Sequence, residues 1–134
     1  MIGVQKLGKT LGAEVTGADL SRAVEPADFE RIVNIFHENG VIVFRNQKLT
    51  SEQHIAFSRR FGDLDVNVRS RFNKPEFPEI LVVSNIVENG QPIGVVDAGR
   101  YWHSDLCYLT EPSRCSLLHA LEVSVGEWHD IAVY

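Results

Sequence analysis

The stretch ILVVSNIVENGQPIGVV, residues 80–96, contains the clearest folding signal in this sequence. Residues 80–87 are typical of a strand, and Asn89-Gly90 favours the positive φ angles of a two-residue hairpin turn. Residues 91–96 then supply the returning strand. This pattern predicts an antiparallel β-hairpin in the second half of the chain.

Short β segments are also predicted on the C-terminal side of this hairpin, at residues 101–105 and 116–123. On its N-terminal side, residues 63–79 contain Pro75 and Pro78 and show no periodicity. We expect a long loop there, and long loops in compact domains are usually functional or disordered.

A helix is predicted in the first half of the chain, over residues 26–38. Pro26 suits a first helical position, and Asn39-Gly40 supplies a left-handed residue to end the helix. The expected apolar stripe consists of Phe29, Ile32, Val33 and Phe36.

Two strands and a second helix complete the expected inventory. Residues 11–16 alternate between apolar and polar, and residues 41–44 form a continuously apolar, buried strand. Thr50 or Ser51 caps the second helix, with Gln53 or Glu52 at the reciprocal position, and Gly62 ends it. Two early helices followed by short strands predict an α+β domain with an antiparallel barrel or jelly roll.

Composition narrows the class of protein. The 134 residues are 44% hydrophobic and 23% charged, which is typical of one globular domain. The net charge of −5, without a basic run, argues against nucleic-acid binding, and no apolar stretch is long enough to span a membrane. Cys107 and Cys115, eight positions apart, match neither a redox pair nor a zinc quartet. We therefore expect a soluble cytoplasmic protein; the oligomeric state is not predicted.

The segment Trp102-His103-Ser104-Asp105 is the strongest candidate for chemistry. On a strand, His103 and Asp105 would lie on the same face, with Cα atoms roughly 6.5–7 Å apart. An imidazole nitrogen and a carboxylate oxygen could then bind one divalent ion, as in the 2-His-1-carboxylate triad of non-haem iron oxygenases. A histidine near an aspartate is also common on ordinary surfaces, so these residues alone leave both interpretations open.

Several short blocks occur in a characteristic order along the chain. They are GADLS at residues 17–21, GVIVFRNQ at 40–47, LTSEQ at 49–53, FSRRFG at 57–62, WHSD at 102–105, EPS at 111–113 and SLLHA at 116–120. This order resembles the front part of the taurine/phenoxyacetate family of Fe(II)- and 2-oxoglutarate-dependent dioxygenases. The resemblance implies a double-stranded β-helix, or jelly roll, with helices outside it. Residues 1–123 would be the N-terminal part of such a domain, an incomplete jelly roll, and residues 124–134 a divergent tail.

The resemblance also implies a site and a reaction. His103 and Asp105 would be two of three Fe(II) ligands, with Leu106 and Tyr108 lining the pocket beside the metal. The family's distal histidine and its 2-oxoglutarate-binding arginine belong beyond residue 134. With O2 and 2-oxoglutarate, such an enzyme hydroxylates a C–H next to a heteroatom of a small anionic sulfonate or aryloxyalkanoate, giving succinate and CO2. The alternative is a catalytically incomplete fragment, a partial jelly roll without enzymatic activity.

Weaker candidates complete the sequence interpretation. Arg69 and Arg71, in the expected loop, could contact an anionic substrate group, because guanidinium suits carboxylates and sulfonates. His129 is a poor substitute third ligand because it lies near the C-terminus. A hydrolase using Ser104 with His103 is disfavoured, since neighbouring strand residues face opposite sides and no GxSxG motif occurs. A nucleophilic Cys107 lacks any identifiable acidifying group.

Overall fold

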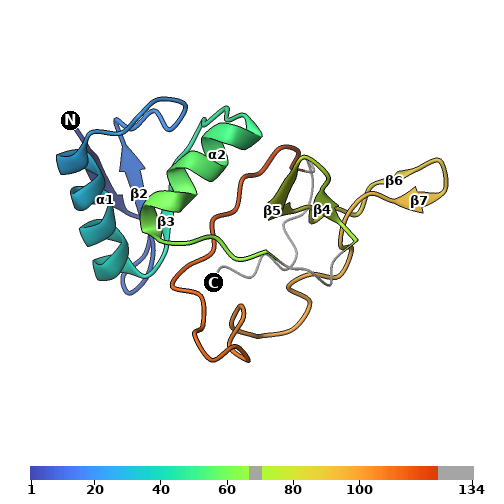
Figure 1. The fold of residues 1–134 in the computed structure, drawn as a ribbon. Helices are drawn as coiled ribbons and strands as arrows, with labels where there is room; N and C mark the ends of the chain where they lie inside the picture. The colour runs from blue at the N-terminus through green and yellow to red at the C-terminus, as the bar shows by residue number, and fades with distance from the viewer. Residues whose placement is uncertain (67–70, 124–134) are drawn as a thin grey trace. The chain divides into compact units, whose positions relative to one another are not determined.

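The computed structural model describes residues 1–66 and 71–123, which belong to two compact units. The first unit is Met1–Phe57, and the second begins at Ser58. The elements in chain order are β1 (Gly3–Lys6), β2 (Ala13–Thr16), α1 (Pro26–Asn39), β3 (Ile42–Val43), α2 (Ser51–Ser58), a 3-10 helix (Arg59–Phe61), β4 (Asn73–Lys74), β5 (Phe77–Leu81), β6 (Val87–Glu88) and β7 (Gln91–Pro92) (Figure 1).

The first unit is built on a three-stranded sheet with the order β1-β2-β3. β1 pairs antiparallel with β2, and β2 pairs parallel with β3, with Ala13 opposite Ile42. Parallel strands need a crossover connection, which α1 supplies as it passes alongside the sheet (Figure 1). The strands predicted at residues 11–16 and 41–44 are therefore confirmed in shortened form, but the second is only half-buried. β1 was not predicted, because its residues after Gly3 are exposed and show no alternation.

The predicted first helix is confirmed with Pro26 at its start. Gly40 follows it with φ 71°, and its N–H donates a hydrogen bond to the Phe36 carbonyl 2.8 Å away. Ile32 is fully buried as expected. Ile35, which lay outside the predicted stripe, is also buried, so the face in contact with the core is wider than the periodicity indicated.

The N-terminus of α2 forms the predicted capping box. The Thr50 N–H donates to Gln53 Oε1 at 2.8 Å, and the Gln53 N–H donates to Thr50 Oγ1 at 3.3 Å. At the other end of the helix, the Phe57 ring makes edge contacts with Phe29 and Phe44, at centroid distances of 6.1 and 5.8 Å. These contacts fix α2 to the core of the first unit.

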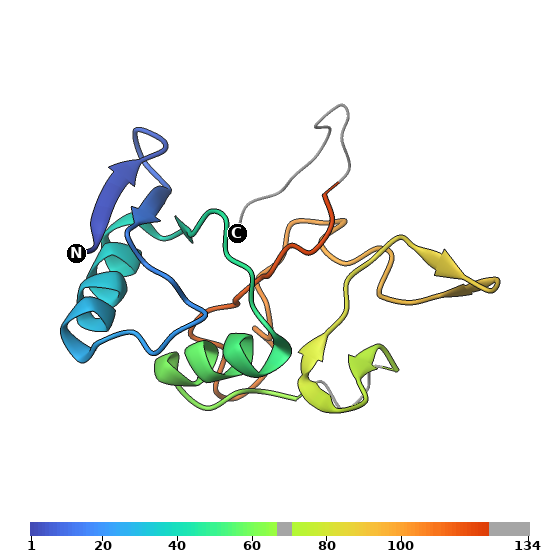
Figure 2. The ribbon, with the colours of Figure 1, turned by 90° about the horizontal axis from the view of Figure 1, so that it is seen from above.

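The second unit contains two separate hairpins, β4–β5 and β6–β7 (Figure 2). The predicted turn is confirmed, with φ angles of 49° at Asn89 and 76° at Gly90. Beside this turn, β6 and β7 are short strands of two residues each. Farther from the turn, the two arms of the predicted hairpin are joined by single backbone hydrogen bonds and not by a continuous ladder; one of them runs from the Ile93 N–H to the Ile86 carbonyl at 3.2 Å.

The long loop predicted over residues 63–79 is wrong in its second half, which contains β4 and the start of β5. Pro75 lies in the connection between the paired residues Lys74 and Phe77. The backbone N–H that proline lacks is therefore not needed for a hydrogen bond between the strands. Pro78 lies next to a register irregularity, and proline is tolerated in strands at such places.

The strands predicted at residues 101–105 and 116–123 are also wrong, because the structure gives both segments irregular backbone. The described residues thus have α+β content but do not form a double-stranded β-helix. The tail predicted at residues 124–134 lies outside the described residues. Among the residues that are described, no helix has the length and hydropathy of a membrane span.

Candidate metal centre

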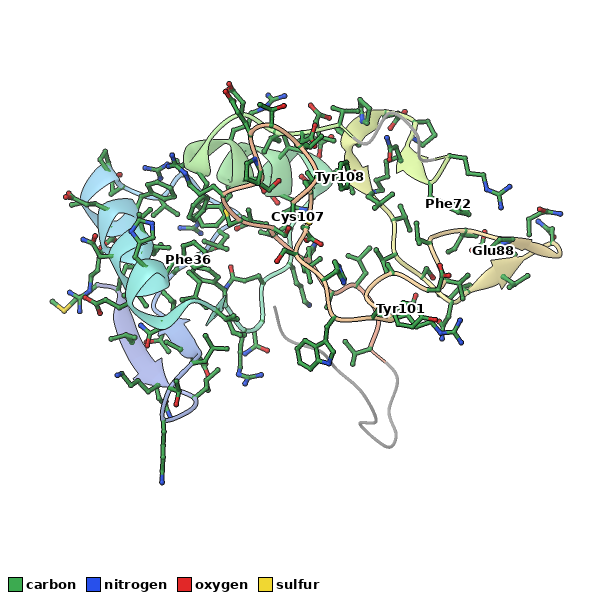
Figure 3. All side chains as sticks on the ribbon, turned by 90° about the horizontal axis from the view of Figure 1, so that it is seen from below. Phe36, Phe72, Glu88, Tyr101, Cys107 and Tyr108 are labelled. Atoms are coloured by element: carbon green, nitrogen blue, oxygen red, sulfur yellow. The ribbon has the colours of Figure 1, made fainter. Side chains whose placement is uncertain are left out.

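The WHSD segment lies between two turns of irregular backbone. The first turn joins the Arg100 N–H to the Asp97 carbonyl at 3.3 Å, and the second joins the Leu109 N–H to the Leu106 carbonyl at 3.0 Å. Leu106 has a φ of 51°, which non-glycine residues seldom adopt and which usually marks a locally constrained backbone. In Figure 3, Tyr101, Cys107 and Tyr108 all project from this loop.

The side chains of His103 and Asp105 converge although their backbone is not a strand. Nε2 of His103 lies 3.1 Å from Oδ1 of Asp105. Residues 102–104 have no regular secondary structure and a turn begins at Asp105, so strand alternation is not what aligns the two side chains. The proximity predicted from the sequence is therefore present, while its predicted structural cause is wrong.

The hydrogen bond of the other ring nitrogen of His103, Nδ1, determines whether Nε2 can bind a metal ion. Nδ1 of His103 lies 2.7 Å from the carbonyl oxygen of Tyr101, which can only accept a hydrogen bond. A neutral ring that donates to this carbonyl through Nδ1 has its lone pair on Nε2, the nitrogen that faces Asp105 and the one that can bind a metal ion.

The second oxygen of Asp105 is also engaged. Ser116 Oγ donates a hydrogen bond to Oδ2 at 2.5 Å, across a separation of eleven residues. Each carboxylate oxygen therefore has its own neighbour. Hydrogen-bonded groups around metal-ligating side chains set their orientation, and His103 and Asp105 both have such a group here.

The candidate centre is open to solvent. The side chains of His103 and Asp105 are 38% and 48% exposed. Within residues 1–66 and 71–123, no group of three His, Cys, Asp or Glu side chains is placed to hold a metal ion. The described residues thus provide two ligands of a possible triad, and His129 lies outside them.

The other residues proposed near the centre are distributed differently. Leu106 is half-buried, and Tyr108 is 76% exposed. Their role as pocket residues stays a prediction. Cys107 is exposed, whereas burial raises the pKa of the Cys115 thiol, which opposes thiolate formation there.

A cavity of about 380 Å³ lies elsewhere in the second unit, between the β4–β5 hairpin and residues 91–93. Its lining combines apolar Phe72, Val82 and Ile93 with the cations Arg71 and Lys74, and no carboxylate among the described residues lines it. The Arg71 guanidinium lies 4.8 Å from the centroid of the Phe72 ring. Arg71 was singled out from the sequence; Lys74 was missed, although it follows at a spacing of three in the same polar stretch. Arg69 lies outside the described residues.

Comparison with known proteins decides the family. The family model described as "Taurine catabolism dioxygenase TauD, TfdA family" matches residues 3–127. The chain belongs to this family. The family resemblance of the sequence blocks is thereby confirmed.

Two curated proteins are similar to this chain over most of its length. Pentalenolactone F synthase of Streptomyces avermitilis is 37% identical over 119 residues, which cover 87% of this chain and 39% of that protein. The alpha-ketoglutarate-dependent 2,4-dichlorophenoxyacetate dioxygenase of a Burkholderia species is 30% identical over 119 residues, covering 81% of this chain and 40% of that protein. The chain thus spans about two fifths of the length of these relatives.

Solved structures agree with this assignment. A candidate alpha-ketoglutarate-dependent 2,4-D dioxygenase from Burkholderia xenovorans has a TM-score of 0.61 at 26% identity, over 85% of this chain and 36% of that one. A taurine dioxygenase from the same organism has a TM-score of 0.52 at 35% identity, over 57% of this chain and 27% of that one. The backbone described here therefore follows part of the fold of this family.

Proposed function

We propose that this chain carries two of the iron ligands of an Fe(II)- and 2-oxoglutarate-dependent dioxygenase, His103 and Asp105. The observation that carries the proposal is the 3.1 Å approach of Nε2 to Oδ1, with Nδ1 committed to the Tyr101 carbonyl. This geometry leaves a nitrogen lone pair and a carboxylate oxygen side by side. Imidazole with carboxylate is the donor set that non-haem Fe(II) oxygenases use.

The chemistry of these two residues supports the assignment. His103 would bind through Nε2 while Tyr101 fixes the tautomer and the ring orientation. Asp105 would supply the negative charge through Oδ1. When bound together with 2-oxoglutarate, iron supplies the oxidising chemistry: O2 is consumed, 2-oxoglutarate becomes succinate and CO2, and the substrate gains a hydroxyl group. The chain's own part is to hold the metal and to orient the substrate.

We propose a small organic anion, such as a taurine-like sulfonate or an aryloxyalkanoate, as the substrate, hydroxylated at a C–H next to its heteroatom. The curated relatives include dioxygenases named for 2,4-dichlorophenoxyacetate and for (S)-phenoxypropionate, both of which are aryloxyalkanoates.

A second candidate function is metal binding without turnover. One observation favours it: the described residues provide only two of the three ligands that a facial triad needs. A site of this kind would bind Fe(II) weakly and would not couple O2 consumption to succinate formation.

Metal binding at the proposed ligands can be measured directly. We expect Mn(II), as an anaerobic substitute for Fe(II), to broaden the NMR signals of the His103 ring first, and the Mn(II) affinity of every variant is measured by water-proton relaxation, which needs no His103 signal. His103→Ala and Asp105→Ala should each weaken Mn(II) binding, whereas His37→Ala and Asp97→Ala, elsewhere in the chain, should not. Equal Mn(II) binding by the wild-type chain and both ligand variants would refute the assignment.

A second measurement separates the two candidate functions. The folded chain is incubated with Fe(II), 2-oxoglutarate, O2 and 2,4-dichlorophenoxyacetate or taurine, and succinate is quantified. Succinate formation that depends on both O2 and His103 supports the dioxygenase. Metal binding without succinate supports the non-catalytic alternative.

A further inference from the structure

We propose that Ser116 is a positioning residue that fixes the Asp105 carboxylate so that Oδ1, and not Oδ2, is presented to a metal. The inference rests on the proposed function for its purpose, but its geometry is independent of any metal. Ser116 Oγ donates to Oδ2 at 2.5 Å, while Oδ1 lies beside Nε2 of His103. Because a carboxylate is planar, holding one oxygen also determines where the other one points.

Such a restraint is needed at this place in the chain. Asp105 lies at the start of an exposed turn, and its side chain is about half exposed, so packing does not select its rotamer. An unrestrained aspartate in such a position would exchange between staggered rotamers. Ordering it when the metal arrives would reduce affinity, whereas a hydrogen bond formed beforehand removes that cost.

The hydrogen bond has a second consequence, for the mode of coordination. The hydroxyl donor on Oδ2 uses one of the two lone pairs of that oxygen and competes with a metal for it, whereas Oδ1 accepts no such bond from Ser116. The hydrogen bond therefore favours coordination of Asp105 through Oδ1 alone. A one-oxygen carboxylate leaves an additional coordination position open, and an oxygenase site requires open positions for its co-substrates.

The chain contains a matched interaction in the other unit. Ser21 Oγ donates to Asp19 Oδ1 at 2.5 Å, also on an exposed surface, but the partners are only two residues apart. Ser21→Ala therefore removes a hydrogen bond of the same kind at a place unrelated to the proposed metal ligands. It is the control for every measurement on Ser116→Ala.

The first test needs no metal. The χ1 torsion of Asp105 is obtained from NMR three-bond couplings in the wild-type chain, Ser116→Ala, Ser116→Thr and Ser21→Ala. We expect one rotamer in the wild type, averaging in Ser116→Ala, and a single rotamer again in Ser116→Thr, which restores the hydroxyl. Dispersed amide spectra confirm that each variant is folded. An unchanged single rotamer in Ser116→Ala would overturn the proposal.

The second test measures Mn(II) affinity by paramagnetic broadening of the His103 ring signals. We expect Ser116→Ala to weaken binding about tenfold, in line with the loss of other groups that orient metal ligands. Ser116→Thr should recover wild-type affinity, and Ser21→Ala should retain it. Wild-type affinity in Ser116→Ala would overturn the role of Ser116. If the folded wild-type chain binds no Mn(II), the metal assignment fails instead, and the rotamer measurement still decides whether Ser116 orders Asp105.

Discussion

The two units of this chain differ in what holds their residues in place. In Met1–Phe57, the buried apolar side chains come from every layer of the unit: Ile2, Ala13, Val15, Leu20, Ile32, Ile35, Ile55 and Phe57. In the described part of the second unit, large apolar side chains are exposed instead, with Trp102 at 87% and Leu118 at 88%. The first unit is held by packing, whereas the segment with the candidate ligands is held by turns and side-chain hydrogen bonds.

This difference matters for the site. Full burial of a large apolar side chain stabilises a fold by about 1.5–3 kcal/mol, and the described residues of the second unit gain little from this source. Individual hydrogen bonds contribute only about 0.5–1.5 kcal/mol each. The geometry of His103 and Asp105 therefore depends on a few specific contacts, each of which can be removed by one substitution.

The largest expected difference between the units is the cost of truncating an apolar side chain. Ile32 is fully buried in α1, so Ile32→Ala should lower the free energy of unfolding by about 2–5 kcal/mol. Leu118 is almost fully exposed, so Leu118→Ala should change it by less than about 0.5 kcal/mol. Urea titration followed by far-UV circular dichroism measures both values. A comparable loss in the two variants would contradict the contrast between the units.

Amide hydrogen exchange should show the same contrast without any substitution. The amides in the middle of α1 are hydrogen-bonded within a helix that packs on a sheet, whereas the described amides of residues 101–123 make few backbone bonds. We expect protection at least about a hundredfold greater in α1. Exchange detected by NMR would refute the comparison if residues 101–123 were as protected as α1.

A smaller effect is expected from the capping box of α2. Thr50→Ala removes the hydroxyl that accepts from the Gln53 N–H, and should lower the free energy of unfolding by about 1 kcal/mol. Thr50→Ser retains an acceptor and should restore most of this loss. Thr10→Ala, on an exposed bend, is the control, and urea denaturation is the measurement. A loss as large for Thr10→Ala would mean that the cap contributes nothing specific.

The same contrast explains how far the sequence predicted the fold. The signals for α1, for its glycine end and for the capping box are local, and all three are found in the structure. In the first unit, neighbouring elements bury Ile32 of the predicted stripe, and its other three members are half-buried. In the second unit, only the turn signal at Asn89-Gly90 depends on neighbouring residues alone, and the structure contains this turn as well.

The wrongly predicted strands at residues 101–105 and 116–123 lie where a prediction needed partners distant in sequence. Residues 116–123 have strand-like composition, but a strand requires a neighbour, and the described residues supply none. For the site, the spacing of His103 and Asp105 correctly predicted their proximity. The contribution of Ser116 could not be predicted, because it depends on how the chain turns between residues 105 and 116.

The smallest effect concerns Asp19, the exposed carboxylate of the first unit. Hydrogen bonds from the Ser21 hydroxyl and backbone N–H, with Arg22 nearby, lower the pKa of Asp19 below its usual value. A lowered pKa in the folded state means that these contacts stabilise the chain above the unfolded-state pKa, and that the stabilisation is lost as the pH falls through the folded-state value. Ser21→Ala should therefore raise the pKa of Asp19 toward normal, as measured by NMR titration of its carboxyl carbon, and Ser116→Ala should leave it unchanged. An unaltered Asp19 pKa in Ser21→Ala would show that an exposed serine hydroxyl does not organise a carboxylate in this chain, which would also weaken the case for Ser116 and Asp105.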